Sequence, residues 1–372
     1  MRECWEYKKL GEIINVRTGK LDANASSEDG QYPFFTCSRE PLRISSYSYD
    51  CECVLVAGNG DLNVKYYNGK FDAYQRTYII TLKESITETS VPYLYKFFTS
   101  YIEVLRQRSI GGIIKYIKLG DITNAILPLP PLSMQETIVS ELDKINELIR
   151  LKKEQLKDYD NLAQSIFYEM FGDPVVNEKG WEVKKFSEVA SFKNGLNFRK
   201  NENGYSYKIL GVGDFKNNYV VNSSLLEYIN LNDELSSDYF LKPEDIVFVR
   251  SNGSKELVGR CVSVDCTEPT TYSGFCIRCR LDENSGVLPM YLLYVCKNKG
   301  IREYLTQSGR GCNISNVNQK ILNSTDIIIP PLSNQELFIQ RIELIEQQKA
   351  EIQNTIAALE TLLASRMQYW FD

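Results

Sequence analysis

The chain has 372 residues, of which 43% are hydrophobic and 24% charged, and its formal net charge at pH 7 is −5. At roughly 150 residues per domain, this length is typical of a protein with two globular domains. The sequence contains no histidine, which excludes Ser-His-Asp and Cys-His nucleophile activation and every histidine-containing zinc site. No apolar run approaches the roughly 20 residues of a membrane span, and the first residues lack the apolar region of a signal peptide. We therefore expect a cytoplasmic protein that does not enter a membrane.

The chain aligns with itself, which indicates an internal duplication. Residues 5–19 (WEYKKLGEIINVRTG) match residues 181–195 (WEVKKFSEVASFKNG), and PPLSMQE at 130–136 matches PPLSNQE at 330–336. Between these anchors the two halves agree only in outline. A common frame with divergent middles predicts two similar domains that present different surfaces.

The first predicted domain covers residues 1–131. The apolar run CVLVAGNG at 53–60 predicts a strand that ends in a Gly/Asn loop. Polar, glycine-rich loops with basic and aromatic residues lie within 58–70, 74–76 and 106–118. Such side chains can read base edges or hold phosphates of DNA, although the same composition is typical of any solvated loop. The candidate DNA-binding residues here are Asn59, Lys65, Tyr66, Lys70, Arg76, Arg108 and Lys115.

A long helix, the central spacer helix, is predicted over residues 132–173. The segment Ser133-Met-Gln-Glu136 has the form of a capping box, and no Gly or Pro interrupts residues 133–170. Its apolar residues follow the spacing of a coiled-coil seam over a length of about 57 Å. The predicted seam residues are Ile138, Leu142, Ile145, Ile149, Leu156 and Ile166, with Lys152 as a polar interruption.

The second predicted domain covers residues 174–331. Its strand DIVFVRSNG at 245–253 corresponds to CVLVAGNG in the first domain, and polar loops lie within 250–255, 271–274 and 307–320. The candidate DNA-binding residues of this half are Arg250, Asn252, Lys255, Tyr272, Arg310, Asn313, Asn316 and Lys320.

Most of the cysteines are predicted to be buried apolar residues with reduced thiols. The motif Cys276-Ile-Arg-Cys279 has the spacing of a zinc or thiol-exchange site, but its surroundings alternate like a strand. That alternation would point the two thiols to opposite faces. Cys51 and Cys53 would share one face of another strand, so all four are expected to be core residues.

Motifs for bound nucleotides or for catalysis are not found. The segment Gly211-Val-Gly213 lacks the third glycine of GxGxxG, and no GxxxxGK[ST] occurs. Asp173 with Glu182-Val-Lys184 loosely resembles a nuclease metal site, but Glu6-Tyr-Lys8 occupies the corresponding place in the first half. We therefore interpret the Glu-x-Lys pattern as part of the repeated frame, and expect no metal ligands in this chain.

A second long helix, the C-terminal spacer helix, is predicted over residues 332–372. It opens with Ser333-Asn-Gln-Glu336, a second capping box. Two such helices can bury their apolar stripes by pairing antiparallel, with the two domains at opposite ends; the alternative is that each packs only onto its own half. The predicted seam residues are Phe338, Ile342, Ile345, Ile352, Ile356, Leu359 and Leu363, with Lys349 and Arg366 as polar interruptions.

Charge is distributed unevenly along the sequence. Residues 132–176 hold nine acidic and five basic side chains, and residues 332–372 hold six and three. Neither globular domain is strongly basic, so charge by itself supports DNA binding only weakly. Within the seam, Lys152 and Lys349 would repel if they met, so we expect each to point outward or to meet a glutamate such as Glu147 or Glu346.

The whole chain closely resembles the specificity subunit of type I restriction-modification enzymes. The resemblance rests on the order variable domain, PPLSxQE helix, variable domain, PPLSxQE helix, with Trp-x-x-Lys-Lys openings and the strand EDIVFVRSNG at 244–253. It implies an α+β fold with two globular α/β target-recognition domains, separated by two long helices that form an antiparallel coiled coil with an internal pseudo-two-fold repeat. It also implies a non-catalytic reader of a bipartite DNA site, with one half-site for each domain.

The resemblance further implies partners. These are double-stranded DNA, two methyltransferase subunits and the restriction subunits, with no membrane; S-adenosylmethionine, ATP and Mg²⁺ would belong to the partner subunits and none to this chain. Three alternatives stay open: an equivalent reader in another restriction-modification assembly, an orphan specificity subunit, and a coiled-coil scaffold that binds no DNA.

Overall fold

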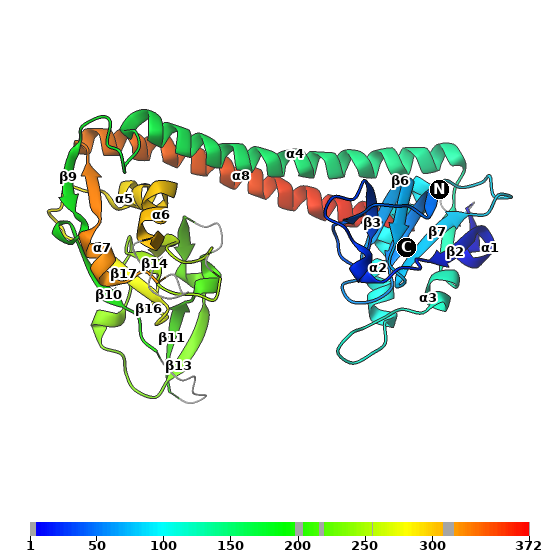
Figure 1. The fold of residues 1–372 in the computed structure, drawn as a ribbon, viewed down its shortest axis with the longest axis horizontal. Helices are drawn as coiled ribbons and strands as arrows, with labels where there is room; N and C mark the ends of the chain where they lie inside the picture. Colours follow the sequence, from blue (N-terminus) through cyan, green and yellow to red (C-terminus); the bar gives the residue numbers. More distant parts are fainter. Residues whose placement is uncertain (1–4, 198–203, 216–218, 255, 308–315, 372) are drawn as a thin grey trace. The chain divides into compact units, whose positions relative to one another are not determined.

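The computed structural model describes residues 5–197, 204–215, 219–254, 256–307 and 316–371. The chain forms two compact units (Figure 1). Unit 1 comprises Met1–Gln155 and Ile352–Asp372, and unit 2 comprises Leu156–Glu351. None of the described helices combines the length and the apolar character needed to cross a membrane.

Unit 1 contains a six-stranded sheet of order β2-β7-β5-β6-β3-β4. Neighbouring strands are antiparallel, except that β3 and β6 are parallel. The strands are β2 (Ile14–Thr18), β3 (Tyr32–Phe35), β4 (Leu42–Ile44), β5 (Tyr49–Ala57), β6 (Val64–Ala73) and β7 (Thr77–Leu82), beside a two-stranded sheet of β1 (Glu6–Lys9) and β8 (Ile126–Leu129). The helices are α1 (Leu10–Ile13), α2 (Val91–Arg108), α3 (Leu119–Thr123) and residues 132–155 of α4 (Leu132–Phe171), together with residues 352–371 of α8 (Leu332–Phe371).

Unit 2 contains a five-stranded sheet of order β10-β17-β14-β15-β12, a three-stranded sheet of order β13-β11-β16, and the pair β18-β9. The strands are β9 (Glu182–Lys185), β10 (Ala190–Asn194), β11 (Tyr205–Leu210), β12 (Val220–Asn222), β13 (Glu227–Leu231), β14 (Ile246–Val249), β15 (Cys261–Asp265), β16 (Thr270–Tyr272), β17 (Cys276–Leu281) and β18 (Asp326–Ile329). Its shorter helices are α5 (Pro289–Lys297), α6 (Lys299–Gln307) and α7 (Gln319–Ser324). Single 3-10 turns connect several of the strands in both units.

The two units share one strand order, which confirms the duplication predicted from the sequence. The run β2-β7-β5-β6-β3 of unit 1 corresponds to β10-β17-β14-β15-β12 of unit 2, and in both runs only the last pair is parallel. A buried tyrosine is repeated as well. The hydroxyl of Tyr93 donates to the carbonyl of Pro128 over 2.9 Å, and that of Tyr291 to the carbonyl of Ile328 over 3.0 Å.

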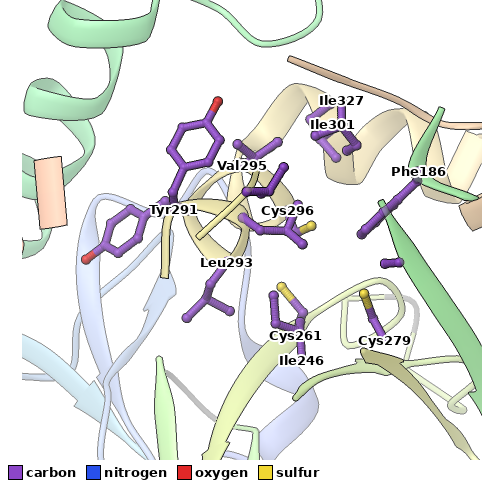
Figure 2. Close-up of a cluster of buried hydrophobic side chains, with 14 of the residues drawn as sticks. Phe186, Ile246, Cys261, Cys279, Tyr291, Leu293, Val295, Cys296, Ile301 and Ile327 are labelled. Carbon is purple, nitrogen blue, oxygen red and sulfur yellow. The ribbon is translucent and has the colours of Figure 1, made fainter. Parts of the chain in front are cut away.

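Apolar residues cover both faces of the central strand in each unit, because successive side chains on a strand point to opposite sides. In β14, Ile246 and Phe248 pack into the core below the helices, while Val247 and Val249 pack into a separate cluster on the other face. Figure 2 draws part of the helix-side core, which includes Tyr291, aliphatic side chains and the thiols of Cys261, Cys279 and Cys296. Because both faces of the strand are buried, its sequence is a continuous apolar run.

The buried cysteines follow the same alternation, as the sequence predicted. Cys279 belongs to the helix-side core and Cys276 to the cluster on the opposite face. Burial raises the pKa of the Cys276 thiol to about 12, which keeps the thiol protonated and unreactive near neutral pH. Cys51 and Cys53 pack into one shared cluster. Within the described residues, no group of three or more Cys, Asp or Glu side chains is placed to hold a metal ion.

The Glu-x-Lys segments lie on the small two-stranded sheets of the repeated frame. Lys8 forms ion pairs with Glu6 and with Glu88, over 3.5 and 2.8 Å. Lys184 pairs with Glu182 over 3.4 Å on β9. Equivalent positions on β1 and β9 support their interpretation as structural residues.

The long helices α4 and α8 run antiparallel within each unit. In unit 1, Glu141 early in α4 pairs with Arg366 late in α8, and Lys153 pairs with Glu360. In unit 2, Phe338 at the start of α8 packs against Phe167 and Phe171 at the end of α4. Antiparallel pairing is therefore confirmed in each unit. Each helix has 40 residues, a length of about 60 Å at 1.5 Å per residue.

The predicted seam is largely buried. The fully buried members are Ile138, Leu142, Ile145, Ile149, Phe338, Ile342, Ile345, Ile352 and Ile356. The half-buried members are Leu156, Ile166, Leu359 and Leu363. Phe167 goes deeper into the core than its predicted neighbour Ile166, because the end of α4 packs on the helices and strands of unit 2 as well as on α8.

The polar interruptions of the seam have partners, as expected. Lys349 forms ion pairs with Glu346 and Asp160, both over 2.8 Å. Lys152 donates to Gln155 over 3.0 Å. Partners of this kind let a lysine stay charged at the edge of an apolar seam.

The predicted capping boxes are wrong. Both helices begin one residue before the serine, and the carbonyl of Pro131 accepts the N–H groups of Met134 and Gln135. The proline therefore takes the place of the cap and the serine lies in the first turn. The residue that organises this corner is the glutamine of PPLSxQE, since Gln135 and Gln335 are both fully buried.

Candidate nucleic-acid interface

Three loops meet through backbone hydrogen bonds at one edge of the sheet in unit 1. They are residues 58–63 after β5, residues 74–76 before β7, and residues 109–118 before α3. The N–H of Gly58 donates to the carbonyl of Arg76 over 2.8 Å, and the carbonyl of Gly58 accepts the N–H of Ile117 over 3.0 Å. We call this cluster the loop face of unit 1.

The corresponding loops of unit 2 meet in the same way. The N–H of Arg250 donates to the carbonyl of Phe275 over 2.8 Å, and the carbonyl of Arg250 accepts the N–H of Val317 over 3.0 Å. Residues 250–254, 273–275 and 316–318 form the loop face of unit 2. Each loop face therefore has a fixed backbone frame on which different side chains are displayed.

The unit 1 loop face holds three of the predicted residues, Asn59, Arg76 and Lys115. Arg76 and Lys115 are exposed and Asn59 is half-buried. The carbonyl of Lys115 accepts the N–H of Gly60 over 2.9 Å, which ties two of the loops together. Arg108, at the end of α2 beside this face, lies with its guanidinium carbon 5.8 Å from the ring centre of Tyr101.

The other predicted residues of unit 1 lie on β6. Lys65 donates to Asn63 of the neighbouring loop, and burial lowers the pKa of its ammonium group. The hydroxyl of Tyr66 donates to Glu52 over 2.6 Å, which raises the pKa of that phenol to about 12. Lys70 lies 4.8 Å from the ring centre of Tyr47. Lys65 thus contacts the loop face through Asn63, whereas Tyr66 and Lys70 are engaged with Glu52 and Tyr47 away from the three loops.

In unit 2 the structure places several of the predicted residues on the surface and corrects one. Arg250 and Asn252 are half-buried on the loop face, Lys320 is exposed on α7, and Asn316 is half-buried. Tyr272 is 0% exposed, with its hydroxyl donating to the carbonyl of Lys193, so its assignment to a DNA contact is wrong. It lies on β16, which pairs with β11, and its side chain belongs to a buried cluster that includes Leu210 and Phe215. Lys255, Arg310 and Asn313 lie outside the described residues.

Exposed apolar side chains on both loop faces are absent from the predicted set. Ile113 is 104% exposed and Ile114 is 62% exposed, at the tip of the hairpin-like loop closed by the bridge between Ile110 and Tyr116. Phe275 is 57% exposed on the unit 2 loop face. Fully exposed apolar side chains on a loop are typical of contact surfaces. The sequence feature that could have identified this exposed tip is the apolar pair Ile113-Ile114 inside a polar, glycine-rich segment.

The long helices present a second surface in unit 1. A groove of about 940 Å³ runs along the first turns of α4 beside the start of α2. Its lining combines the apolar Val139 and Leu148 with the acidic Glu136, Asp143 and Glu147. An apolar groove bordered by acidic groups can accommodate apolar and basic side chains of another protein.

Comparison with known proteins identifies the family. The family model for the type I restriction modification DNA specificity domain matches the chain twice, at residues 2–158 and 178–361. Residues of the chain are 42% identical over 153 positions to the type I restriction enzyme EcoDI specificity subunit of Escherichia coli, covering 41% of this chain and 34% of that protein. The StySPI specificity subunit of Salmonella potsdam is 24% identical over 285 positions, covering 71% of this chain and 61% of that protein. The chain thus spans a third to three fifths of the length of these relatives.

A solved structure from a study of complex assembly and conformational transition in the type I restriction-modification system has the same fold. It matches with a TM-score of 0.61 at 18% identity, covering 99% of this chain and 97% of that chain. The two family matches together cover most of the chain and coincide with the duplicated frame of the two units. The chain is a member of the type I restriction-modification DNA specificity family.

Proposed function

We propose that the chain reads a bipartite DNA sequence, with the loop face of each unit contacting one half-site. The observation that carries the proposal is the repeated loop frame: the same backbone hydrogen bonds hold three loops in both units, but the side chains displayed on them differ. A duplicated frame with different contact residues suits the recognition of two different half-sites. The chain serves recognition, while its partner subunits supply catalysis.

On the unit 1 loop face, the exposed Arg76 and Lys115 can bind guanine edges or phosphates, and Asn59 can bind adenine. The apolar tip at Ile113 can contact a thymine methyl group or insert between base steps. On the unit 2 loop face, Arg250 and Asn252 have the corresponding chemistry. The remaining predicted residues apart from the buried Tyr272, including Lys320 on α7, are proposed to contact the flanking phosphates.

The long helices are proposed to space the half-sites and to dock the methyltransferase subunits. The groove in unit 1 along α4, with its apolar floor and the acidic Glu136, Asp143 and Glu147, supports this proposal. Two methyltransferase subunits and the restriction subunits complete the assembly in the cytoplasm. S-adenosylmethionine, ATP and Mg²⁺ are assigned to those subunits, because the sequence of this chain contains neither a nucleotide-binding loop nor a histidine.

The test is the pattern of adenine methylation across the genome of a methylation-free host. The host would express this chain with the methyltransferase encoded beside it, and the methyltransferase alone would be the control. We expect a bipartite motif that depends on this chain. A co-purifying complex that methylates nothing would contradict the proposed reading of DNA in an active system and favour an orphan reader. A chain that binds neither DNA nor a methyltransferase would favour the scaffold alternative.

A further inference from the structure

A polar cavity of about 290 Å³ lies in unit 2, between the end of α4, the start of β15 and the junction of α5 and α6. Beside this cavity the helical segment is broken at Asn298, whose side-chain oxygen accepts the N–H of Gly300 over 2.8 Å. In unit 1 the corresponding helix α2 is continuous from Val91 to Arg108. The cavity is therefore a feature of unit 2 that the duplicated frame does not require.

Three basic side chains converge on this cavity: Arg260, Lys297 and Arg302. Backbone carbonyls fix the two guanidinium groups, since Arg260 donates to Glu256 over 3.1 Å and Arg302 donates to Val258 over 3.4 Å. The ammonium group of Lys297 lies 4.0 Å from the ring centre of Tyr219, which forms one wall. Guanidinium groups held in this way are arranged to donate to an oxyanion.

The charges around the cavity favour an anionic occupant. Burial lowers the pKa of Lys297, the neighbouring cations Arg260 and Lys349 also lower it, and Cys261 and Asp160 oppose this shift. Burial and Arg260 also lower the pKa of Arg302. Among the described residues of the lining, the acidic one is Asp160, which pairs with Lys349 over 2.8 Å. An added anion would relieve the repulsion between these cations.

A second observation comes from the adjoining cavity of about 90 Å³, which shares Lys297 and Tyr219 with the first. It is also lined by Tyr294, which is 4% exposed. The Tyr294 hydroxyl is buried and has no hydrogen-bond partner among the described residues. A buried hydroxyl without a hydrogen-bond partner is unfavourable. This hydroxyl shares its cavity with Lys297, so it can donate to an acceptor oxygen of a ligand that also reaches this ammonium group.

We propose that this cavity, the Lys297 pocket, binds a phosphate group through Arg260, Lys297 and Arg302. A phosphate offers acceptor oxygens in several directions, which matches the convergent donors. The source we favour rests on the proposed function: a backbone phosphate of the DNA held by unit 2. Phosphate contacts fix the register of a protein on DNA without reading its sequence, so the pocket would position the loop face of unit 2 over its half-site.

The test uses the full chain in two assays. In the first, thermal unfolding of the chain alone is followed with inorganic phosphate and with KCl at equal ionic strength. In the second, binding of the chain with its methyltransferase to duplexes with and without the methylated motif is followed by fluorescence anisotropy across a range of KCl concentrations. The variants are Lys297→Met and Arg302→Gln. The matched control is Lys242→Met, because Lys242 is an exposed lysine just before β14, at the opposite end of that strand from Arg250 of the loop face.

We expect phosphate to raise the unfolding temperature of the wild type and of Lys242→Met, but not of Lys297→Met or Arg302→Gln. Both pocket variants should weaken DNA binding roughly tenfold, equally for both duplexes, and reduce the slope of log K against log salt by about one. Two independent variants are measured so that a folding defect in one of them cannot by itself explain the result.

The two proposals fail in different ways. If the wild type binds DNA but the pocket variants change neither phosphate stabilisation nor DNA binding, the Lys297 pocket is refuted and the proposed function stands. If only the phosphate effect is lost, the pocket binds free phosphate and the DNA source is refuted. If the wild type binds no DNA, the proposed function fails, and the phosphate assay still decides whether the pocket is an anion site.

Discussion

At the scale of single residues, Gln135 connects the start of α4 to the segment before α2. Its amide nitrogen donates to the carbonyls of Glu88 and Pro130 over 2.7 and 2.9 Å, and its amide oxygen accepts from the hydroxyl of Thr89 over 2.9 Å. Gln335 makes the corresponding contacts in unit 2, donating to the carbonyls of Gly286 and Pro330 and accepting from the N–H of Leu288. The paired glutamines explain why this residue recurs in both halves.

Replacing Gln135 with Leu should destabilise the protein. The leucine leaves the carbonyls of Glu88 and Pro130 buried without these donors, at a cost of about 2–4 kcal/mol. The measurement is urea unfolding, with Gln353→Leu on the exposed face of α8 as the matched control. Equal unfolding midpoints for the two variants would contradict the role assigned to Gln135.

At the scale of elements, the pairing of α4 with α8 combines an apolar seam with an ion pair at its edge. Arg366 binds Glu141 through two nitrogens, and the indole N–H of Trp370 donates to the same carboxylate over 3.0 Å. The ring of Trp370 also stacks on Trp5, with 6.1 Å between ring centres. The end of α8 is thereby fixed to both α4 and the first strand region of unit 1.

The Glu141–Arg366 pair makes a pH-dependent contribution to stability. The hydrogen bond from Arg366, followed by that from Trp370, lowers the pKa of Glu141 below its ordinary value of 4.5. A carboxyl group with a lowered pKa in the folded state stabilises the protein above its unfolded pKa, and this stabilisation is lost as the pH falls through the folded pKa. The pair is partly exposed, so we expect about 1 kcal/mol.

The measurement compares thermal unfolding of Glu141→Gln and wild type from pH 7 to pH 3. The variant should be less stable at pH 7, and the difference should shrink below pH 4.5 as the wild-type carboxyl group is protonated. Glu351→Gln, on the exposed surface of α8, is the control. A difference that stayed constant over this range would show that the charge of Glu141 is not the cause.

At the scale of the whole molecule, duplication gives two loop faces with one backbone frame and different residues. Arg76 and Arg250 take part in corresponding backbone contacts of the two faces, Arg76 through its carbonyl and Arg250 through its N–H and carbonyl. If each face reads one half-site, their side chains act on separate parts of the motif. The energies of well-separated contacts add.

Arg76→Ala should therefore relax only the first half of the methylated motif, and Arg250→Ala only the second. Each should cost about 1–3 kcal/mol of binding free energy if the arginine binds a guanine, and the double variant should cost the sum. Methylation profiles of the two single variants and the double variant provide the measurement. A uniform loss across all sequences would instead identify the arginine as a phosphate contact.

The sequence by itself determined the duplication, the two seam helices and the burial of most of the described cysteines. These features follow from local patterns: a repeat of segments, apolar spacing near 3.5 residues, and the alternation of a strand that places Cys276 and Cys279 on opposite faces. Lys349 pairs with the predicted Glu346, and this too follows from a local pattern, because the two residues lie one helical turn apart.

Only the tertiary structure decided which loop residues lie together and which are buried. Tyr272 occurs in a polar, glycine-containing segment typical of a loop, but pairing of β16 with the distant β11 buries it. The meeting of Gly58 with Arg76 and Ile117, and the Lys297 pocket at the break between α5 and α6, depend on contacts between segments far apart in the chain. Local spacing specifies the face of one element, whereas a binding surface depends on backbone hydrogen bonds and packing between elements, which no local pattern encodes.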